Sequence, residues 1–127
     1  MSSLGGVLIA EDEEEIRELL AMIFEMEQFT VFRAVDGQHA LEIFSEHLDE
    51  IALLITDLGL PRLGGVDLIE KVRALKPTVR IIGSSGYGRA NVRKEVLAAG
   101  ADDFMPKPFV AAELVLKAKK MLGIDVE

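Results

Sequence analysis

The stretch IALLITDLGLPRLGG, residues 51–65, contains the pattern that decides the fold. Its first six residues are apolar or β-branched without polar alternation, which predicts a short strand covered on both faces. The strand then delivers a single carboxylate, Asp57, and passes into a loop rich in glycine. An aspartate that only starts a turn is common after a strand, but a charge carried to the end of a buried strand indicates a function.

The same alternation of short apolar runs and longer segments of helical period continues along the chain. The predicted strands are Val7–Ala10, Thr30–Ala34, Ile51–Thr56, Arg80–Ser84 and Asp103–Met105, and the predicted helices are Glu14–Glu27, Gln38–His47, Val66–Leu75, Asn91–Ala99 and Val110–Leu122. Five strand–helix pairs predict a doubly wound α/β fold with a parallel sheet in the flavodoxin-like order 2-1-3-4-5. We expect a single domain over residues 1–127, with its core in residues 5–122.

The composition excludes several classes of function. A formal net charge of −8 argues against direct nucleic acid binding, which depends on basic residues. No segment reaches the roughly 20 apolar residues of a membrane span, and the first residues lack the pattern of a secretory signal. Without cysteine there is no disulfide framework and no thiolate metal site. We therefore expect a cytoplasmic protein that does not bind membranes.

The residues that follow the predicted strands carry the chemistry, because the carboxyl ends of parallel strands meet at one edge of a sheet. Glu11 and Asp12 follow the first strand, Asp57 the third, Ser85 the fourth and Lys107 the fifth. A group of carboxylates without His or Cys favours a hard ion, and Mg²⁺, with Mn²⁺ as the alternative, suits a site that also holds a phosphate oxygen. The lysine and the hydroxyl beside it indicate that the site binds a phosphoryl group.

The loop after the first strand argues against the nucleotide or flavin that this fold often binds. Such a ligand needs a Gly-rich loop with free backbone N–H groups at that position. This chain instead has the acidic run EDEEE at residues 11–15, which would repel a phosphate.

Four segments at the predicted strand ends resemble the receiver domain of two-component response regulators: VLIAEDE at residues 7–13, ITDLGLP at 55–61 with Gly65 after it, SGY at 85–87 and KPF at 107–109. The resemblance covers essentially the whole chain. It implies that Asp57 is the phosphoacceptor, which takes a phosphoryl group from a phosphohistidine on a histidine kinase or phosphotransfer domain. It also implies that Glu11, Asp12, Asp57 and the backbone carbonyl of Gly59 bind Mg²⁺.

The resemblance assigns roles to further residues. Ser85 and Lys107 would bind the phosphoryl oxygens, and Phe104 would be the switch aromatic that turns when Ser85 moves inward. The Lys107–Pro108 peptide bond would be cis, a state that costs little only before proline. The phosphoryl group would thus shift the population between two packings, which is read out on the face of the fourth helix, fifth strand and fifth helix.

Other positions tune this chemistry or depart from the family pattern. Gly59 and Tyr87 occupy the positions, two residues after the acceptor and after the switch serine, that tune hydrolysis of the acyl phosphate. Glu11 stands where Asp is also common, which lengthens the arm without changing the charge. Gly64 stands where the family often has Asp or Asn, so the third helix lacks a side-chain N-cap worth about 1 kcal/mol.

The resemblance also implies partners. An output protein would contact the face formed by the fourth helix, fifth strand and fifth helix, and the domain would be a monomer or a phosphorylation-linked dimer. The first helix has more apolar residues than one buried stripe needs, among them Met22 and Met26, so it either has a wide core face or docks a kinase helix pair. No output segment follows Gly123, which predicts a stand-alone regulator or a receiver cut from a larger regulator or hybrid kinase.

We interpret the chain as a signalling switch rather than an enzyme, although it takes part in its own phosphorylation and dephosphorylation. One alternative is a phosphatase or phosphotransferase with an aspartyl-phosphate intermediate. Those enzymes usually carry a second Asp two positions after the nucleophile, where this chain has Gly59. The other alternative is a degenerate receiver that acts only as an interaction module, against which the intact Asp57, Ser85 and Lys107 argue.

Overall fold

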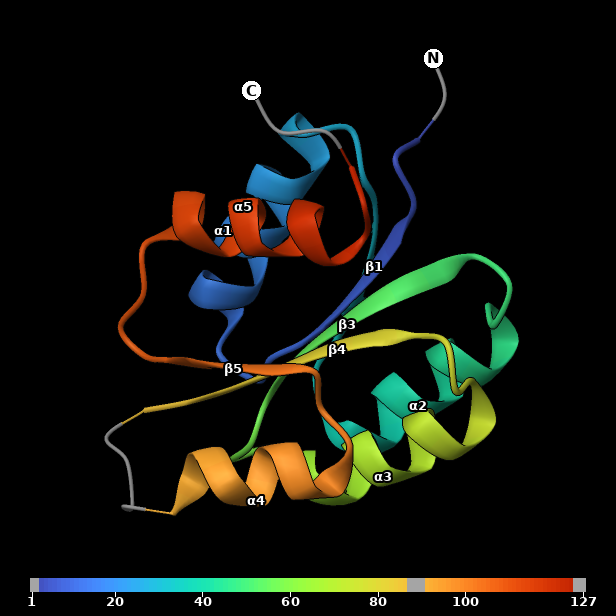
Figure 1. Ribbon diagram of the computed structural model, residues 1–127, viewed down its shortest axis with the longest axis vertical. Helices are drawn as coiled ribbons and strands as arrows, with labels where there is room; N and C mark the ends of the chain where they lie inside the picture. Colours follow the sequence, from blue (N-terminus) through green and yellow to red (C-terminus); the bar gives the residue numbers. More distant parts are fainter. Residues whose placement is uncertain (1–2, 87–90, 125–127) are drawn as a thin grey trace.

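A computed structural model describes residues 3–86 and 91–124 of the chain. Its strands are β1 (Gly6–Ala10), β2 (Thr30–Ala34), β3 (Ile51–Asp57), β4 (Arg80–Ser85) and β5 (Asp103–Pro106). They form one sheet in the order β2-β1-β3-β4-β5, in which every neighbouring pair is parallel (Figure 1). The predicted doubly wound α/β fold and its strand order are therefore confirmed.

Helices cover both faces of this sheet. They are α1 (Glu14–Met26), α2 (Gly37–Glu46), α3 (Gly65–Leu75), α4 (Val92–Ala99) and α5 (Ala111–Met121). Helices α1 and α5 lie on one face, and α2, α3 and α4 lie on the other (Figure 1). Among the described residues, no helix combines the length and apolar character needed to cross a membrane.

Strand residues alternate between two hydrophobic clusters, which explains the continuous apolar run of β3. Leu54 belongs to the cluster under α2, α3 and α4, whereas Leu53 and Ile55 belong to the cluster under α1 and α5. Both leucines are fully buried. Burial of one such side chain contributes about 1.5–3 kcal/mol, so the strand that carries Asp57 is firmly fixed in the core.

Three strands extend one residue beyond their predicted ends, β3 to Asp57, β4 to Ser85 and β5 to Pro106, and the first two extensions concern the site. Asp57 pairs in register with Ser84, and Ser85 pairs with Pro106. Both predictions ended a strand before a polar or turn-forming residue, but pairing with the neighbouring strand continues the ladder. Asp57 and Ser85 are therefore held by the sheet rather than by a loop.

The helix ends follow local sequence signals. Asp36 caps α2 by accepting a hydrogen bond from the His39 N–H at 2.7 Å. Gly64 precedes α3 and provides no side-chain cap, as the sequence predicted. Glycines follow two of the helices, since Gly100 follows α4 with a φ of 120° and Gly123 follows α5 with a φ of 72°.

Asp103, at the start of β5, ties that strand to both neighbouring helices. It forms ion pairs with Lys117 of α5 and, at 3.7 Å, with Arg93 of α4. Burial alone would raise the pKa of Asp103, but the hydrogen bonds from Lys117 and from the Phe104 N–H, together with the charge of Arg93, hold it below its ordinary value. The ionised carboxylate therefore stabilises the packing of α4, β5 and α5.

We expect Asp103→Asn to lower the free energy of unfolding by about 1 kcal/mol at neutral pH, because it removes charge-assisted contacts from a partly exposed site. Since the folded pKa lies below the unfolded value, this contribution is present above the ordinary value of 3.8 and is lost as pH falls through the folded pKa. Urea unfolding of both proteins between neutral and acidic pH measures the difference. A difference that stays constant across this range would contradict the account.

Candidate functional site

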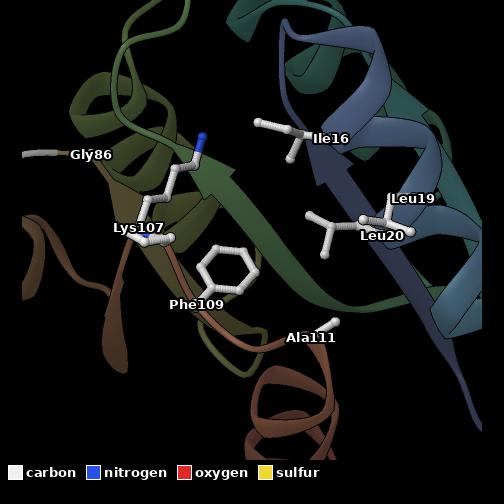
Figure 2. Close-up of a pocket in the computed structure, with 8 residues that line it drawn as sticks. Ile16, Leu19, Leu20, Gly86, Lys107, Phe109 and Ala111 are labelled. Carbon is white, nitrogen blue, oxygen red and sulfur yellow. The ribbon is translucent and has the colours of Figure 1, made fainter.

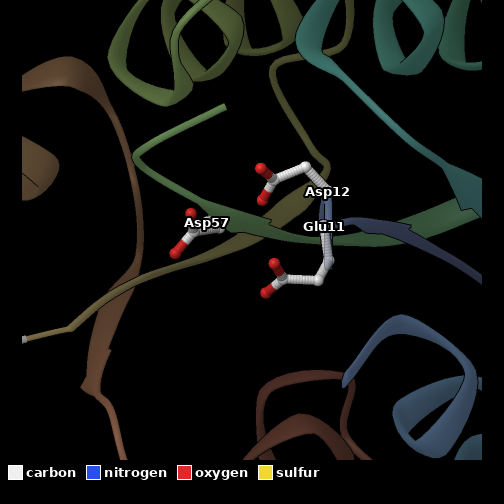
Figure 3. A group of neighbouring side chains, drawn as sticks. All are labelled: Glu11, Asp12 and Asp57. Atoms are coloured by element: carbon white, nitrogen blue, oxygen red, sulfur yellow. The ribbon is translucent and has the colours of Figure 1, made fainter. Parts of the chain in front are cut away.

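Three carboxylates meet at the carboxyl edge of the sheet. Glu11 and Asp12 directly follow β1, Asp57 ends β3, and one oxygen of each lies within 4.8 Å of the others. Figure 3 shows Glu11 and Asp12 extending toward the end of β3, where Asp57 lies. Glu11 is only 3% exposed, Asp57 is half-buried and Asp12 is exposed, so the group extends from a buried floor to solvent. We call these three residues the acidic cluster.

Lys107, from the segment after β5, lies against the acidic cluster. Its Nζ is 2.7 Å from Glu11 Oε1 and 3.1 Å from Asp57 Oδ1. Burial lowers the pKa of Lys107, but the hydrogen bonds to Glu11 and Asp57 outweigh that effect and raise the pKa above its ordinary value. Burial raises the pKa of Glu11, and the hydrogen bonds from Lys107 and from the Glu13 N–H offset only part of the rise. The ammonium of Lys107 thus contacts the carboxylates of both Glu11 and Asp57.

Backbone N–H groups orient the carboxylates. The Glu13 N–H donates to Glu11 Oε2, and the Gly59 N–H donates to Asp57 Oδ2, each at 3.1 Å. The Leu58 N–H donates to a carbonyl of β4 at 2.9 Å, so the chain just beyond Asp57 remains attached to the sheet. Asp57 therefore presents its two oxygens to different partners, Oδ2 to the loop and Oδ1 to the interior of the site.

The donor set of the acidic cluster fits a hard divalent cation. It consists of carboxylate oxygens alone, and Mg²⁺ usually binds one or two carboxylates while keeping several waters. Glu11 already accepts hydrogen bonds on both oxygens, whereas Asp12 is exposed. Asp12 is therefore the carboxylate most open to an ion that arrives from solvent.

The remaining residues singled out in the sequence lie around this cluster. Ser85 is half-buried, and its carbonyl accepts a hydrogen bond from the Lys107 N–H at 2.8 Å. Phe104 is half-buried and packs against the cluster under α2, α3 and α4. The Lys107–Pro108 peptide bond is cis. Tyr87 lies outside the described residues.

Ser84, the last residue of the predicted fourth strand, is unusual in this setting. It is 3% exposed, and its Oγ has no hydrogen-bond partner among residues 3–86 and 91–124. It stands in register between Asp57 of β3 and Met105 of β5, so these side chains point to the same face of the sheet. A buried hydroxyl without a partner costs about 1–3 kcal/mol.

An apolar groove of about 430 Å³ adjoins the site on the side of α1. Figure 2 shows Ile16 and Leu20 extending from α1 toward Phe109, which follows the cis peptide bond. Lys107 also lines this groove, which therefore reaches the edge of the acidic cluster. Leu19 lines it as well and is 51% exposed, so part of the surplus apolar surface of α1 faces solvent rather than the core.

Residues 7–119 match the family described as the response regulator receiver domain. The chain belongs to this family. It is a receiver domain of a response regulator in a two-component system, a class of protein that works as a signalling switch. The resemblance drawn from the four sequence motifs is thereby confirmed.

Individual relatives agree with the family match. The transcriptional regulatory protein SrrA of Staphylococcus aureus is 39% identical over 116 residues, which are 91% of this chain and 47% of that protein. The chain thus spans about half the length of the curated relatives it matches. A response regulator receiver domain protein from Clostridium thermocellum has a TM-score of 0.88 at 25% identity, over 94% of this chain and 95% of its own. A chain of the CheX–CheY–BeF3–Mg²⁺ complex from Borrelia burgdorferi has a TM-score of 0.85 at 26% identity, over 91% and 87%.

Sequence reasoning missed contacts that exist only in the folded receiver domain. It placed Lys107 near Asp57 but did not foresee its shorter contact with Glu11, 96 positions away in the sequence. It also missed an ion pair of 3.2 Å between Asp36 and Arg62, two residues of different loops. The Asp-Gly pair before an apolar helical run signals the helix cap, but no local pattern indicates which loop the cap contacts.

We expect Ser84→Ala to leave the stability of the receiver domain unchanged or to raise it by about 1 kcal/mol, because it removes a buried hydroxyl that has no partner. Thr56→Val is the matched control. Thr56 is fully buried, but its hydroxyl donates to the Asp57 carbonyl at 3.0 Å. That variant should lose about 1 kcal/mol. Urea unfolding compares the two, and an equal loss in both variants would show that the Ser84 hydroxyl is partnered.

Proposed function

We propose that Asp57 is the phosphoacceptor of this receiver domain. The observation that supports this most directly is the position of its carboxylate, which ends a buried strand 3.1 Å from the Lys107 ammonium and within the acidic cluster. A phosphoryl group brings negative charge with it, so an acceptor needs fixed positive charge beside it. Lys107, directly after β5, already lies where that charge is needed.

In the proposed reaction, a carboxylate oxygen of Asp57 attacks the phosphorus of a phosphohistidine on a histidine kinase or phosphotransfer domain. The O–P bond forms as the P–N bond breaks, and the electron pair of the P–N bond leaves with the imidazole. The Gly59 N–H, bound to Oδ2, orients the carboxylate. Lys107 then pairs with the phosphoryl oxygens, in keeping with a reaction that depends mainly on positioning and electrostatic stabilisation.

We propose Mg²⁺ as the cofactor, with Mn²⁺ as the alternative. Its ligands would be Glu11, Asp12, Asp57 and the backbone carbonyl of Gly59. When bound, the ion supplies positive charge to the phosphoryl oxygens. The oxygen-only donor set supports this choice. So does the likeness to the Borrelia burgdorferi complex, which is described with Mg²⁺ and BeF3.

We further propose that the acyl phosphate draws Ser85 inward and that Phe104 turns in response. The hydrogen bond between the Ser85 carbonyl and the Lys107 N–H supports a joint movement of the ends of β4 and β5. The output partner would bind the face of α4, β5 and α5, where Leu97, Val110 and Leu116 are exposed. The domain would be a monomer or a dimer linked to phosphorylation, in the cytoplasm. Hydrolysis of the acyl phosphate would be tuned at Gly59 and Tyr87.

Two alternatives fit the site less well. A phosphatase or phosphotransferase with an aspartyl-phosphate intermediate would need an acid two residues after Asp57, where Gly59 has no side chain. A degenerate receiver that acts only as an interaction module would not need the bond between Lys107 and Asp57. The proposed switch uses both features.

Incubation with Mg²⁺ and acetyl phosphate tests the acceptor. Wild-type protein should gain the mass of one phosphoryl group, whereas Asp57→Asn should gain none, because an amide oxygen is a poor nucleophile. Asp67→Asn, which changes an exposed acid of α3, should behave as wild type. Removing Mg²⁺ with EDTA should slow the reaction by about 10²-fold or more. Intact mass spectrometry provides the readout, and an undiminished adduct on Asp57→Asn would refute the assignment.

We also propose that the groove beside α1 contacts the phosphodonor protein, since it is apolar and reaches Lys107 at the edge of the site. Leu19→Ala should raise the KM for a phosphorylated kinase or phosphotransfer domain by about 5- to 30-fold, as expected for one central apolar contact. The rate with acetyl phosphate should not change.

Leu75→Ala is the control for this variant. Leu75 is 47% exposed, close to the 51% of Leu19, but it belongs to α3 on the opposite face of the sheet. Initial rates at several donor concentrations separate KM from kcat. Equal effects of the two substitutions on KM would rule out the groove as the docking surface.

A further inference from the structure

The turn between β2 and α2, residues 34–37, contacts both halves of the proposed metal site. On one side, the Ala34 carbonyl accepts a hydrogen bond from the Glu11 N–H at 3.1 Å. This bond fixes the backbone at the point where β1 delivers Glu11 and Asp12. The turn is thus attached to the strand end that carries two of the three clustered carboxylates.

On the other side, the same turn contacts the loop after β3. The Gly37 N–H donates to the Pro61 carbonyl at 3.3 Å, and Asp36 Oδ2 lies 3.2 Å from Arg62 Nε. The other oxygen of Asp36 caps α2 through the His39 N–H. Asp36 therefore joins the start of a helix to the loop that contains Gly59.

The loop at this contact is strained. Arg62 has a φ of 71°, and the Leu63 N–H donates to the Pro61 carbonyl at 2.9 Å, which together form a γ-turn with a left-handed central residue. Such turns are rare, and they persist only when the surrounding structure holds them. The Arg62 side chain is 74% exposed, so its own packing does not provide that support. The contact with the turn at residues 34–37 provides it.

Gly37 makes this contact possible. A Cβ at position 37 would lie 1.7 Å from the Leu63 carbonyl oxygen, so only glycine allows the turn to approach the γ-turn so closely. The loop is fixed at its other points by Leu60, which is 7% exposed in the core, and by the Gly65 N–H, which donates to the Leu58 carbonyl at 3.1 Å. Gly59 lies between these anchors.

We propose that Asp36 and Gly37 are positioning residues for metal binding. They set the separation between the strand end of Glu11 and Asp12 and the loop that contributes the Gly59 carbonyl, and they thereby determine the affinity of the site for Mg²⁺. This inference rests on the proposed function, because it assumes that the acidic cluster and Gly59 hold the ion. It adds two residues that touch neither the ion nor the phosphoryl group.

Gly37→Ala tests the proposal with Mg²⁺ alone as the ligand. Its methyl group would push the loop away from α2, and the Kd for Mg²⁺ should rise by about tenfold or more, as for other residues that support metal ligands. Titration calorimetry provides the Kd, and urea unfolding gives the stability and confirms that the protein is folded at the temperature used.

Gly6→Ala is the matched control. Its Cβ would lie 2.3 Å from the Glu50 carbonyl oxygen, so it creates the same kind of backbone clash at the opposite end of β1. This variant should lose stability while its Kd for Mg²⁺ stays at the wild-type value. An unchanged Kd in folded Gly37→Ala, or an equal rise in Gly6→Ala, would overturn the proposal.

Two charge variants provide a second test that does not depend on the folding of Gly37→Ala. Asp36→Asn keeps a side chain that caps α2 but breaks the ion pair with Arg62, and Arg62→Gln breaks the same pair from the other side. If the pair positions the loop, both variants should raise the Kd for Mg²⁺, by about two- to threefold for an exposed pair. If only long-range charge matters, Arg62→Gln should lower the Kd, which would contradict the proposal.

The outcomes also separate this inference from the proposed function. If the wild-type protein neither binds Mg²⁺ nor becomes phosphorylated, the proposed function itself is refuted. If wild-type protein binds Mg²⁺ and the Kd is unchanged in Gly37→Ala, Asp36→Asn and Arg62→Gln, only the positioning role of the turn is refuted.

Discussion

Repulsion among three carboxylates at one edge of a parallel sheet is the constraint on which the site depends. Two like charges 4 Å apart repel by about 4 kcal/mol at the effective dielectric constant of a protein surface. Among the described residues, the carboxylates of the acidic cluster, Glu11, Asp12 and Asp57, have one compensating charge within contact distance, the ammonium of Lys107. The sum of three negative charges and one positive charge is −2, which a divalent cation neutralises. The charges of the site thus favour a divalent cation, in agreement with the proposed cofactor.

The fold holds this repulsive arrangement by distributing it over separate elements. Glu11 and Asp57 come from adjacent strands whose apolar residues fill both hydrophobic clusters, so neither strand can shift to relieve the repulsion. Backbone N–H groups of Glu13 and Gly59 hold one oxygen of each carboxylate. The stability of the core therefore keeps the proposed acceptor, Asp57, in place at the sheet edge despite this repulsion. The hydrogen bond from the Lys107 N–H to the Ser85 carbonyl joins the ends of β4 and β5 beside the proposed acceptor, and β5 belongs to the proposed output face.

The fold was predictable because its signals are local or periodic. The apolar run of β3, the helical period of α1 and the glycine after α4 each act within a few residues, and the strand order follows from general rules of α/β topology. The ends of β3 and β4 were placed one residue short, because pairing with a neighbouring strand overrides the local preference of Asp57 and Ser85.

The site was predictable only in part. The shared edge of the sheet predicts which residues lie close together. The resemblance to the family motifs then indicates their proposed roles. The bonds among them depend on side-chain reach, so the contact of Lys107 with Glu11 could not be derived from spacing. The sequence also does not predict the γ-turn at Arg62. A positive φ at an arginine opposes its intrinsic preference and arises from tertiary contact.

Beryllofluoride mimics an acyl phosphate, so a crystal structure of the protein with Mg²⁺ and beryllofluoride tests the central claim most directly. The account predicts beryllofluoride on a carboxylate oxygen of Asp57, in contact with Lys107 Nζ and Ser85 Oγ. It predicts Mg²⁺ bound to that carboxylate, to the acids after β1 and to the Gly59 carbonyl. Beryllofluoride on another residue, or Mg²⁺ bound away from Asp57, would contradict it.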